Sequence, residues 1–182
     1  MDRLITTVVT SALVATVAGA AINAWLDNRK SKHATRFEAL SAAVSLEGYA
    51  LACSDKIADH DLALSSDGHA GAFLGSVPEF SELSVIAGFL RPKKASVANR
   101  LMIFPQDIRQ AGQQIAFWWD VTADAEQTHA AAVIQVSQIG IMAMDLAKDM
   151  REAFELPSRE LVFGAYNVRQ TLTENIKEHS DV

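Results

Sequence analysis

The sequence contains a single cysteine, four prolines and nine glycines among its 182 residues. The lone cysteine, Cys53, excludes an intramolecular disulfide framework and any zinc or redox site built from paired cysteines. With 49% hydrophobic and 21% charged residues, the composition also excludes a disordered or collagen-like chain. The length suits one globular domain.

Positive charge is scarce outside one short segment. Residues 29–36 contain four basic side chains and no acidic one, whereas residues 37–182 contain 11 basic and 20 acidic side chains, a net charge of −9. A domain of this sign repels phosphate backbones, because nucleic-acid binding depends on clustered Lys and Arg. The sequence therefore predicts no nucleic-acid partner.

A long uncharged run occupies residues 4–26. Its 23 residues would span about 34 Å as an α-helix, enough to cross a hydrocarbon core of about 30 Å. Trp25 lies where an interfacial aromatic residue is expected, and Arg29, Lys30 and Lys32 follow it. The positive-inside rule then predicts a single-pass protein of the cell (inner) membrane, with its N-terminus outside and its C-terminal domain in the cytoplasm.

These features divide the chain into a short N-terminal tail (1–3), a transmembrane helix (4–26), a basic juxtamembrane segment (27–36) and an acidic helical domain (37–182). Two alternatives use the same residues. Cleavage of a signal peptide near Ala20 would export the domain, because Ala18-Gly19-Ala20 fits a cleavage site. A buried soluble helix is the other alternative. The anchor is favoured because the apolar run continues to Leu26 and is followed by basic residues that are poorly translocated.

Small side chains recur every fourth residue within the run, at Ser11, Ala15 and Gly19. Such rows let helix backbones approach closely and associate in lipid. The pattern predicts self-association of the chain through this face of the membrane helix.

Beyond residue 37 the apolar residues recur at helical spacing, and no stretch shows the sustained alternation of a half-buried strand. The predicted fold class is therefore all-α, a single N-terminal transmembrane helix followed by a four- to five-helix antiparallel bundle. Glycine, proline and serine residues between about residues 65 and 82 predict the main loop. Residues 83–90 are a short apolar run that forms either a buried helical turn or a segment on the membrane surface.

Each predicted helix of the body has its own apolar face. The helix over residues 35–64, which can continue from the membrane helix without a break, presents Phe37, Leu40, Val44, Leu51, Ala58 and Leu62, widened by Leu46, Ala50, Cys53 and Ile57. The next begins near Ser96, and Pro105 either kinks it or starts a new helix that presents Ile108, Ala111, Ile115 and Trp118. Residues 123–154 have the cleanest register, at Val133, Val136, Gly140, Ala143, Ala147, Met150 and Phe154. A last helix follows Pro157 and buries Leu161, Ala165, Val168 and Leu172.

Candidate chemistry is confined to one polar segment. His60, Asp61 and His69 are weak candidates for ligands of a divalent metal, because imidazoles and carboxylates near a helix end can hold one. The His60-Asp61 pair resembles the central dipeptide of HD-type phosphohydrolases, a resemblance that covers two residues and implies an all-α metal-dependent hydrolase. The alternative is a polar helix end whose side chains form caps and turns.

Two further features have alternative interpretations. Cys53 lies among alanine and leucine residues, which predicts a buried, inert thiol. Phe117-Trp118-Trp119 is the densest aromatic cluster and either packs in the core or anchors a partner protein or the bilayer interface.

The sequence favours a membrane-anchored helical protein that acts through protein–protein interaction, as a scaffold, adaptor or regulatory subunit. No catalytic residue and no cofactor are expected, and the expected partners are the lipid bilayer and an unidentified protein. The alternatives are a membrane-tethered metal-dependent hydrolase using His60, Asp61 and His69, and a membrane-active effector of the toxin or defence type.

Overall fold

The computed structural model describes residues 2–81, 89, 94–121 and 125–180, and for residues 2–22 it describes the backbone alone. Within these residues the fold is all-α with one small hairpin, and it agrees with the predicted fold class in being a helical bundle. The elements are α1 (Asp2–Ser65), α2 (Ala95–Val121), α3 (Ala125–Ala153), β1 (Val162–Phe163), β2 (Tyr166–Asn167) and α4 (Val168–Ser180).

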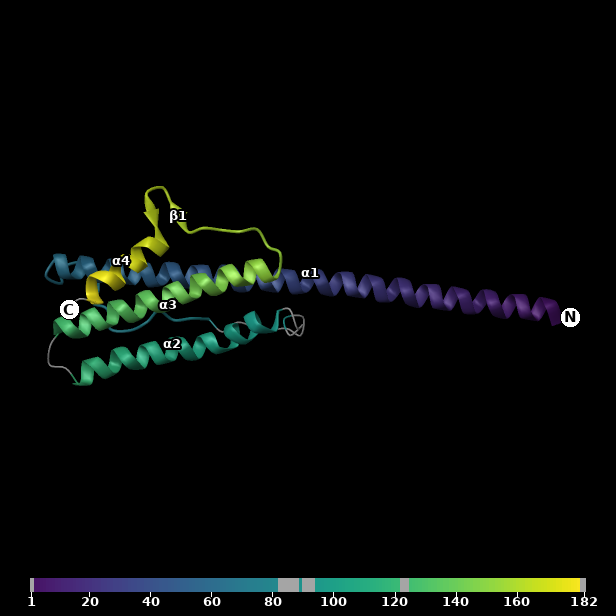
Figure 1. Ribbon diagram of the computed structural model, residues 1–182, viewed down its shortest axis with the longest axis horizontal. Helices are drawn as coiled ribbons and strands as arrows, with labels where there is room; N and C mark the ends of the chain where they lie inside the picture. Colours follow the sequence, from purple (N-terminus) through teal and green to yellow (C-terminus); the bar gives the residue numbers. More distant parts are fainter. Residues whose placement is uncertain (1, 82–88, 90–93, 122–124, 181–182) are drawn as a thin grey trace.

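Helix α1 is continuous over 64 residues and is much longer than the bundle to which it contributes. Its C-terminal half packs against the other helices, while its N-terminal half projects from the bundle as a single rod (Figure 1). Residues 23–34 are all exposed, and Thr35 is the first buried residue of the described side chains. The predicted continuity between the uncharged run and the first helix of the body is therefore confirmed.

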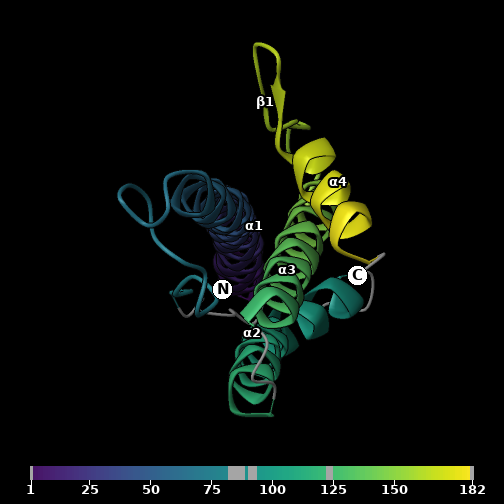
Figure 2. The ribbon, with the colours of Figure 1, turned by 90° about the vertical axis from the view of Figure 1, so that its left-hand side faces the viewer.

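Helix α3 is the centre of the bundle and contacts α1, α2 and α4 (Figure 2). The seven positions predicted for its apolar stripe are all buried: Val133, Val136, Gly140, Ala143, Ala147, Met150 and Phe154. Small residues dominate the face of α1 that packs on α3, including Ala39, Ala42, Ala43 and Ala50, each at most 3% exposed. Small side chains on both helices allow the two backbones to approach closely.

The helices approach closely at Gly140, in the middle of α3. A Cβ atom at this position would lie 3.0 Å from Cys53 Cβ on α1 and 2.9 Å from Leu172 Cδ1 on α4. Three helices therefore meet at one residue that has no side chain. A larger residue therefore requires α1 to shift at Cys53 and the Leu172 side chain to reorient.

The buried face of α1 is rotated from the predicted one. Phe37, Val44 and Leu62 were expected in the core, but they are 69%, 46% and 48% exposed. The residues expected only to widen the stripe, including Leu46 and Ile57, are fully buried instead. The apolar stripe of α1 covers too much of its circumference for periodicity to select one side, and the small residues that fit α3 decide the orientation.

Helix α2 passes through Pro105 without ending, so this proline lies inside one helix rather than at the start of a second. The predicted positions Ile108, Ala111 and Ile115 are buried. Trp118, expected on the same face, is 38% exposed because the end of α2 extends past the core.

The segment after Pro157 is not helical until Val168, contrary to the prediction. Residues 156–161 form an extended strap, and β1 and β2 pair as an antiparallel hairpin in which Val162 opposes Asn167. Gly164 in the turn has a φ of 63°, a conformation that favours glycine and breaks the helical pattern. Leu161 and Val168 are buried as predicted. They lie at the base of the hairpin, where the Val168 N–H donates a hydrogen bond to Leu161 O at 3.1 Å. Ala165, also predicted to be buried, is exposed.

The predicted main loop is confirmed over residues 66–81, which contain neither helix nor strand. Gly71 has a φ of 75°, and a Cβ there would lie 2.2 Å from Asp59 O, so only glycine fits. Of the run 83–90, only Phe89 is described; it is fully buried, with its ring centroid 4.8 Å from that of Phe154. The other residues of this run lie outside the described part of the chain.

Among the described residues, one helix is long and apolar enough to cross a membrane, and it is α3. The apolar window of α3 is 56% buried inside the bundle, as expected for the core helix of a folded domain. Ser11, Ala15 and Gly19, together with the rest of the 4–26 run up to Ile22, lie outside the side chains that the structure describes.

Replacing Gly140 by valine is expected to lower the free energy of unfolding by about 2 kcal/mol, because overpacking a close helix contact typically costs about 1–3 kcal/mol. Thermal unfolding followed by circular dichroism measures the change. Gly48→Ala is the matched control, because Gly48 is also inside a helix but has no atom within 4 Å of its missing Cβ. That control should gain about 0.5–1 kcal/mol from reduced backbone freedom. Equal stability of the two variants would contradict the close approach.

Candidate functional site

Basic side chains form a stripe along α1 where it leaves the bundle. Arg29, Lys32, His33 and Arg36 are spaced at i, i+3, i+4 and i+7, which places them on one face of the helix. Lys30, from the same basic segment, lies off this face. Arg29, Lys30 and Lys32 are predicted together as membrane-interface residues, but in the structure Lys30 points away from the face that carries Arg29 and Lys32.

This stripe lines a pocket of about 350 Å³ together with Lys94, Phe154 and Glu155 from the end of the bundle. The Arg36 Nη2 group donates a hydrogen bond to Glu155 O at 2.5 Å. The Lys94 ammonium lies 3.9 Å from the centroid of the Phe154 ring. We refer to this cavity, lined by Arg29, Lys32, His33, Thr35, Arg36, Lys94, Phe154 and Glu155, as the basic pocket.

The contribution of Lys94 was not foreseen from the sequence, because it depends on which end of α2 lies beside α1. The run Arg91-Pro92-Lys93-Lys94 was a signal that a second basic segment existed. Trp25, predicted at the membrane interface, is 59% exposed, and the Arg29 guanidinium lies 5.6 Å from the centre of its ring. An indole and a cation in this arrangement attract each other.

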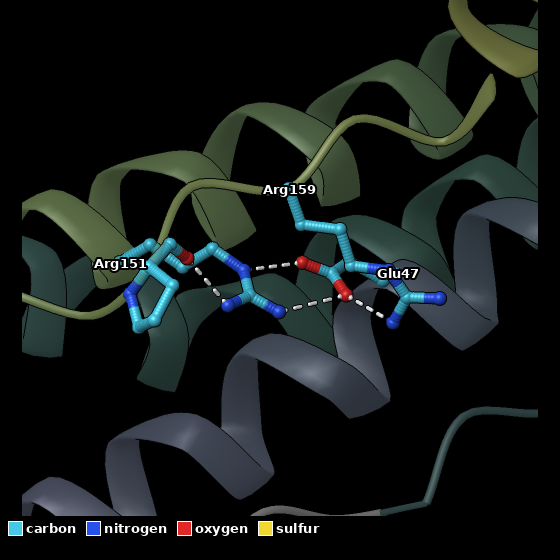
Figure 3. A network of polar contacts seen from close by, with 4 residues as sticks. Glu47, Arg151 and Arg159 are labelled. Carbon is cyan, nitrogen blue, oxygen red and sulfur yellow. Dashed lines mark hydrogen bonds and ion pairs between the residues drawn. The ribbon is translucent and has the colours of Figure 1, made fainter.

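A buried ion pair joins α1 to α3 further into the bundle (Figure 3). Arg151 donates to Glu47 through Nε at 2.6 Å and through Nη2 at 3.1 Å, and both side chains are under 10% exposed. Arg151 Nη1 also donates to Pro157 O at 2.8 Å, and Arg159 Nη1 donates to the second Glu47 oxygen at 3.0 Å. The network therefore binds the strap to both helices, and its donors and acceptors satisfy one another.

A larger cavity of about 560 Å³ lies over this network, between α3, the strap and the hairpin. Its walls carry charges of both signs; for example, Arg169 Nη2 donates to Asp145 at 2.6 Å. Glu47, Arg151 and Arg159 pair within the network below it, and Lys148 pairs with Glu152 at 3.9 Å. We assign this region a structural role, holding the strap and hairpin on the bundle.

The end of the bundle opposite the rod, where α1 and α2 end and α3 begins (Figure 1), includes Phe117, Trp118 and Trp119 in the last turns of α2. Phe117, Trp118 and Trp119 are 58%, 38% and 44% exposed, so core packing is excluded for them. The Trp119 ring lies 5.3 Å from His129, and Phe73 stacks on the same histidine at 5.4 Å. We call Phe73, Phe117, Trp118 and Trp119 the aromatic end.

The predicted metal candidates are not brought together. His60 is 1% exposed and accepts a hydrogen bond from the Leu74 N–H at 3.3 Å, whereas Asp61 and His69 are exposed. Burial, and secondarily the neighbouring His129, lower the pKa of His60 below its ordinary value, so the imidazole is neutral at pH 7. Among the described residues, no three His, Cys, Asp or Glu side chains are grouped to hold a metal ion.

Cys53 is fully buried beside Gly140, and burial raises the pKa of its thiol to about 12. A thiol of this pKa is not ionised at physiological pH and is a poor nucleophile. The predicted inert thiol agrees with this environment, and the residue serves as a small apolar side chain in the α1–α3 contact.

Comparison of the chain with protein-family models, curated proteins and solved structures finds no match.

Glu47→Ala is expected to lower the free energy of unfolding by about 3 kcal/mol or more, because it leaves Arg151 buried without its counter-ion. Chemical denaturation of the purified chain measures the loss. Asp145→Ala is the control, since its ion pair with Arg169 is nearly half exposed on both sides and is worth less than about 1 kcal/mol. A loss of similar size in both variants would show that the Glu47 network does not hold the strap.

Proposed function

We propose that the protein is a single-pass membrane protein whose cytoplasmic helical bundle binds a protein partner, as a scaffold, adaptor or regulatory subunit. In this proposal residues 4–26 cross the cell (inner) membrane with the N-terminus outside. Two copies associate through Ser11, Ala15 and Gly19.

One observation carries the membrane assignment: the uncharged run continues directly into the rod that projects from the bundle. No charged residue occurs between positions 4 and 26, and the backbone of this part of α1 extends away from the other described elements (Figure 1). A helix of this composition gains little from propensity alone and needs a partner or a bilayer for its apolar side chains. The run of 23 residues matches the thickness of the hydrocarbon core.

The charge distribution supports the orientation. The basic pocket lies just past the uncharged run, at the end of the bundle that would face the membrane. Lys and Arg residues close to a span favour the cytoplasmic side. The remainder of the bundle is acidic, so the anionic inner leaflet repels it and holds its far end away from the lipid surface.

The aromatic end supports the interaction assignment. It lies at the end of the bundle opposite the rod, so bilayer anchoring does not explain its exposure. The last turns of α1, the start of the loop and the last turns of α2 also carry exposed acidic residues: Asp59, Asp61, Asp67 and Asp120. Tryptophan at an exposed patch is typical of binding hot spots, and the acidic surroundings favour a partner segment that combines apolar and basic side chains.

Membrane insertion is tested by fusing to Val182 either a fluorescent protein active in the cytoplasm or a phosphatase active only after export. We expect fluorescence, no phosphatase activity and a full-length mass. Val14→Lys should release the chain from the membrane fraction, because lysine at the centre of a span costs about 3 kcal/mol. Ala34→Lys, outside the span, should leave it bound. Phosphatase activity would contradict the orientation, and a chain shortened near Ala20 would contradict the anchor.

Partner binding is tested by placing a photo-crosslinking amino acid at Phe117 in the full chain in its native membrane. We expect a discrete crosslinked protein whose attached peptide carries basic and apolar residues. Phe163, 51% exposed at the hairpin, is the control for an exposed aromatic position. Equal crosslinking from both positions, or crosslinks only to a second copy, would contradict the aromatic end as the partner site.

A further inference from the structure

We propose that the basic pocket is a binding site for a single phosphate group, of the kind carried by an anionic phospholipid headgroup. The inference uses the proposed membrane location for the source of the phosphate, but not for the chemistry of the pocket. The positive-inside rule explains basic residues beside a span by their charge alone, whereas a phosphate site requires them to bind one ligand.

The lining of the basic pocket is strongly cationic. The pocket is lined by four permanent cations, Arg29, Lys32, Arg36 and Lys94, and by one carboxylate, Glu155. These charges sum to +3, whereas the whole chain has a net charge of −6. The pocket is therefore a local concentration of positive charge on an acidic molecule. Two guanidinium groups and an ammonium group from α1, with a second ammonium group from Lys94 just before α2, suit the several oxygens of one phosphate.

The basic stripe begins close to the end of the proposed membrane span. With the span ending at Leu26, Arg29 lies about 4.5 Å beyond it and His33 about 10 Å beyond it, at a rise of about 1.5 Å per residue. Headgroups occupy a layer about 5–8 Å thick on each side of the hydrocarbon core. Arg29 is thus close to the depth of lipid phosphates, and the rest of the stripe, from Lys32 to Arg36, lies just beyond the headgroup layer.

The N-terminal end of α2 lies beside the basic pocket. This 27-residue helix begins at Ala95, directly after the pocket-lining Lys94, and has no acidic residue in its first turn. The N-terminal end of a helix carries a partial positive charge that attracts anions. The positive end of the α2 dipole therefore adds to the positive electrostatic potential that the basic side chains produce in the pocket.

The size of the pocket restricts the ligand. A cavity of about 350 Å³ accommodates a headgroup phosphate with its glycerol, not a nucleic-acid backbone running across the surface. A zwitterionic headgroup also carries a phosphate, but its own cation would meet the pocket cations. The geometry therefore points to phosphate groups without a neighbouring cation, as in phosphatidylglycerol.

Native mass spectrometry of the full chain in nonionic detergent tests this proposal with phosphatidylglycerol and phosphatidylcholine as probes. We expect phosphatidylglycerol to remain bound and phosphatidylcholine to be lost. Lys94→Gln should weaken phosphatidylglycerol binding about fivefold, since a cation near an anionic lipid is worth about 1 kcal/mol. Arg36 is left intact because its bond to Glu155 O also holds α1 against the bundle.

Lys30→Gln is the matched control. It removes the same charge from the same basic segment, but Lys30 does not line the pocket. We expect it to change binding less than twofold. Equal effects of Lys30→Gln and Lys94→Gln, no effect of Lys94→Gln, or equal binding of the two lipids would overturn the discrete site. Circular dichroism of each variant confirms that the helices are intact.

Inorganic phosphate added as a competitor separates the two sources of the ligand. Displacement of the lipid, sensitive to Lys94→Gln, shows that free phosphate also fills the site, whereas retention of the lipid identifies the headgroup as its source. The topology reporter at Val182 keeps the two proposals distinguishable. Lipid binding without membrane topology would overturn the proposed function alone, and correct topology without lipid binding would overturn the pocket alone.

Discussion

The contact between α1 and α3 is the constraint on which the rest of the structure depends. Gly140 lets the two helices meet with almost no side chain between them, and Cys53 fills the remaining space. Glu47 and Arg151 bridge the same pair of helices with a buried, bidentate ion pair. Because α1 is one continuous helix, this contact also sets the direction in which the N-terminal rod leaves the bundle.

The two groups of charged residues in this molecule have opposite characters. In the Glu47 network the carboxylate and both guanidinium groups are paired with each other and with the strap. The lining of the basic pocket has four cations and a single carboxylate, so it keeps a net positive charge although Arg36 bonds to Glu155 O and Lys94 lies over the Phe154 ring. The first arrangement stabilises the fold, and the second is suited to a ligand from outside the chain. This contrast is the physical basis for assigning function to the pocket rather than to the more deeply buried charges.

The molecule is also polarised along its length. One end of the bundle carries the rod and the basic pocket, and the other carries the aromatic end among carboxylates. The proposed anchor, the proposed phosphate site beside it and the proposed protein-binding end away from it are consistent with this polarity. In the proposed function, the bundle then presents its aromatic end to the cytoplasm at a fixed distance from the lipid.

The sequence by itself determined the helical class, the main loop, the full register of α3 and the acidic body, because these follow from local spacing and composition. It did not determine which side of α1 is buried, since apolar residues cover most of that helix and only the fit of small residues to α3 selects a face. The sequence did not predict the hairpin after Pro157, because the spacing of Leu161 and Val168 fits the apolar stripe of a helix as well as it fits the two ends of a hairpin. Lys94 joined the basic pocket only through the tertiary structure, because the direction of α2 relative to α1 depends on packing over the whole core. Local periodicity records what each segment can bury, and only the assembled helices decide which residues distant in sequence meet.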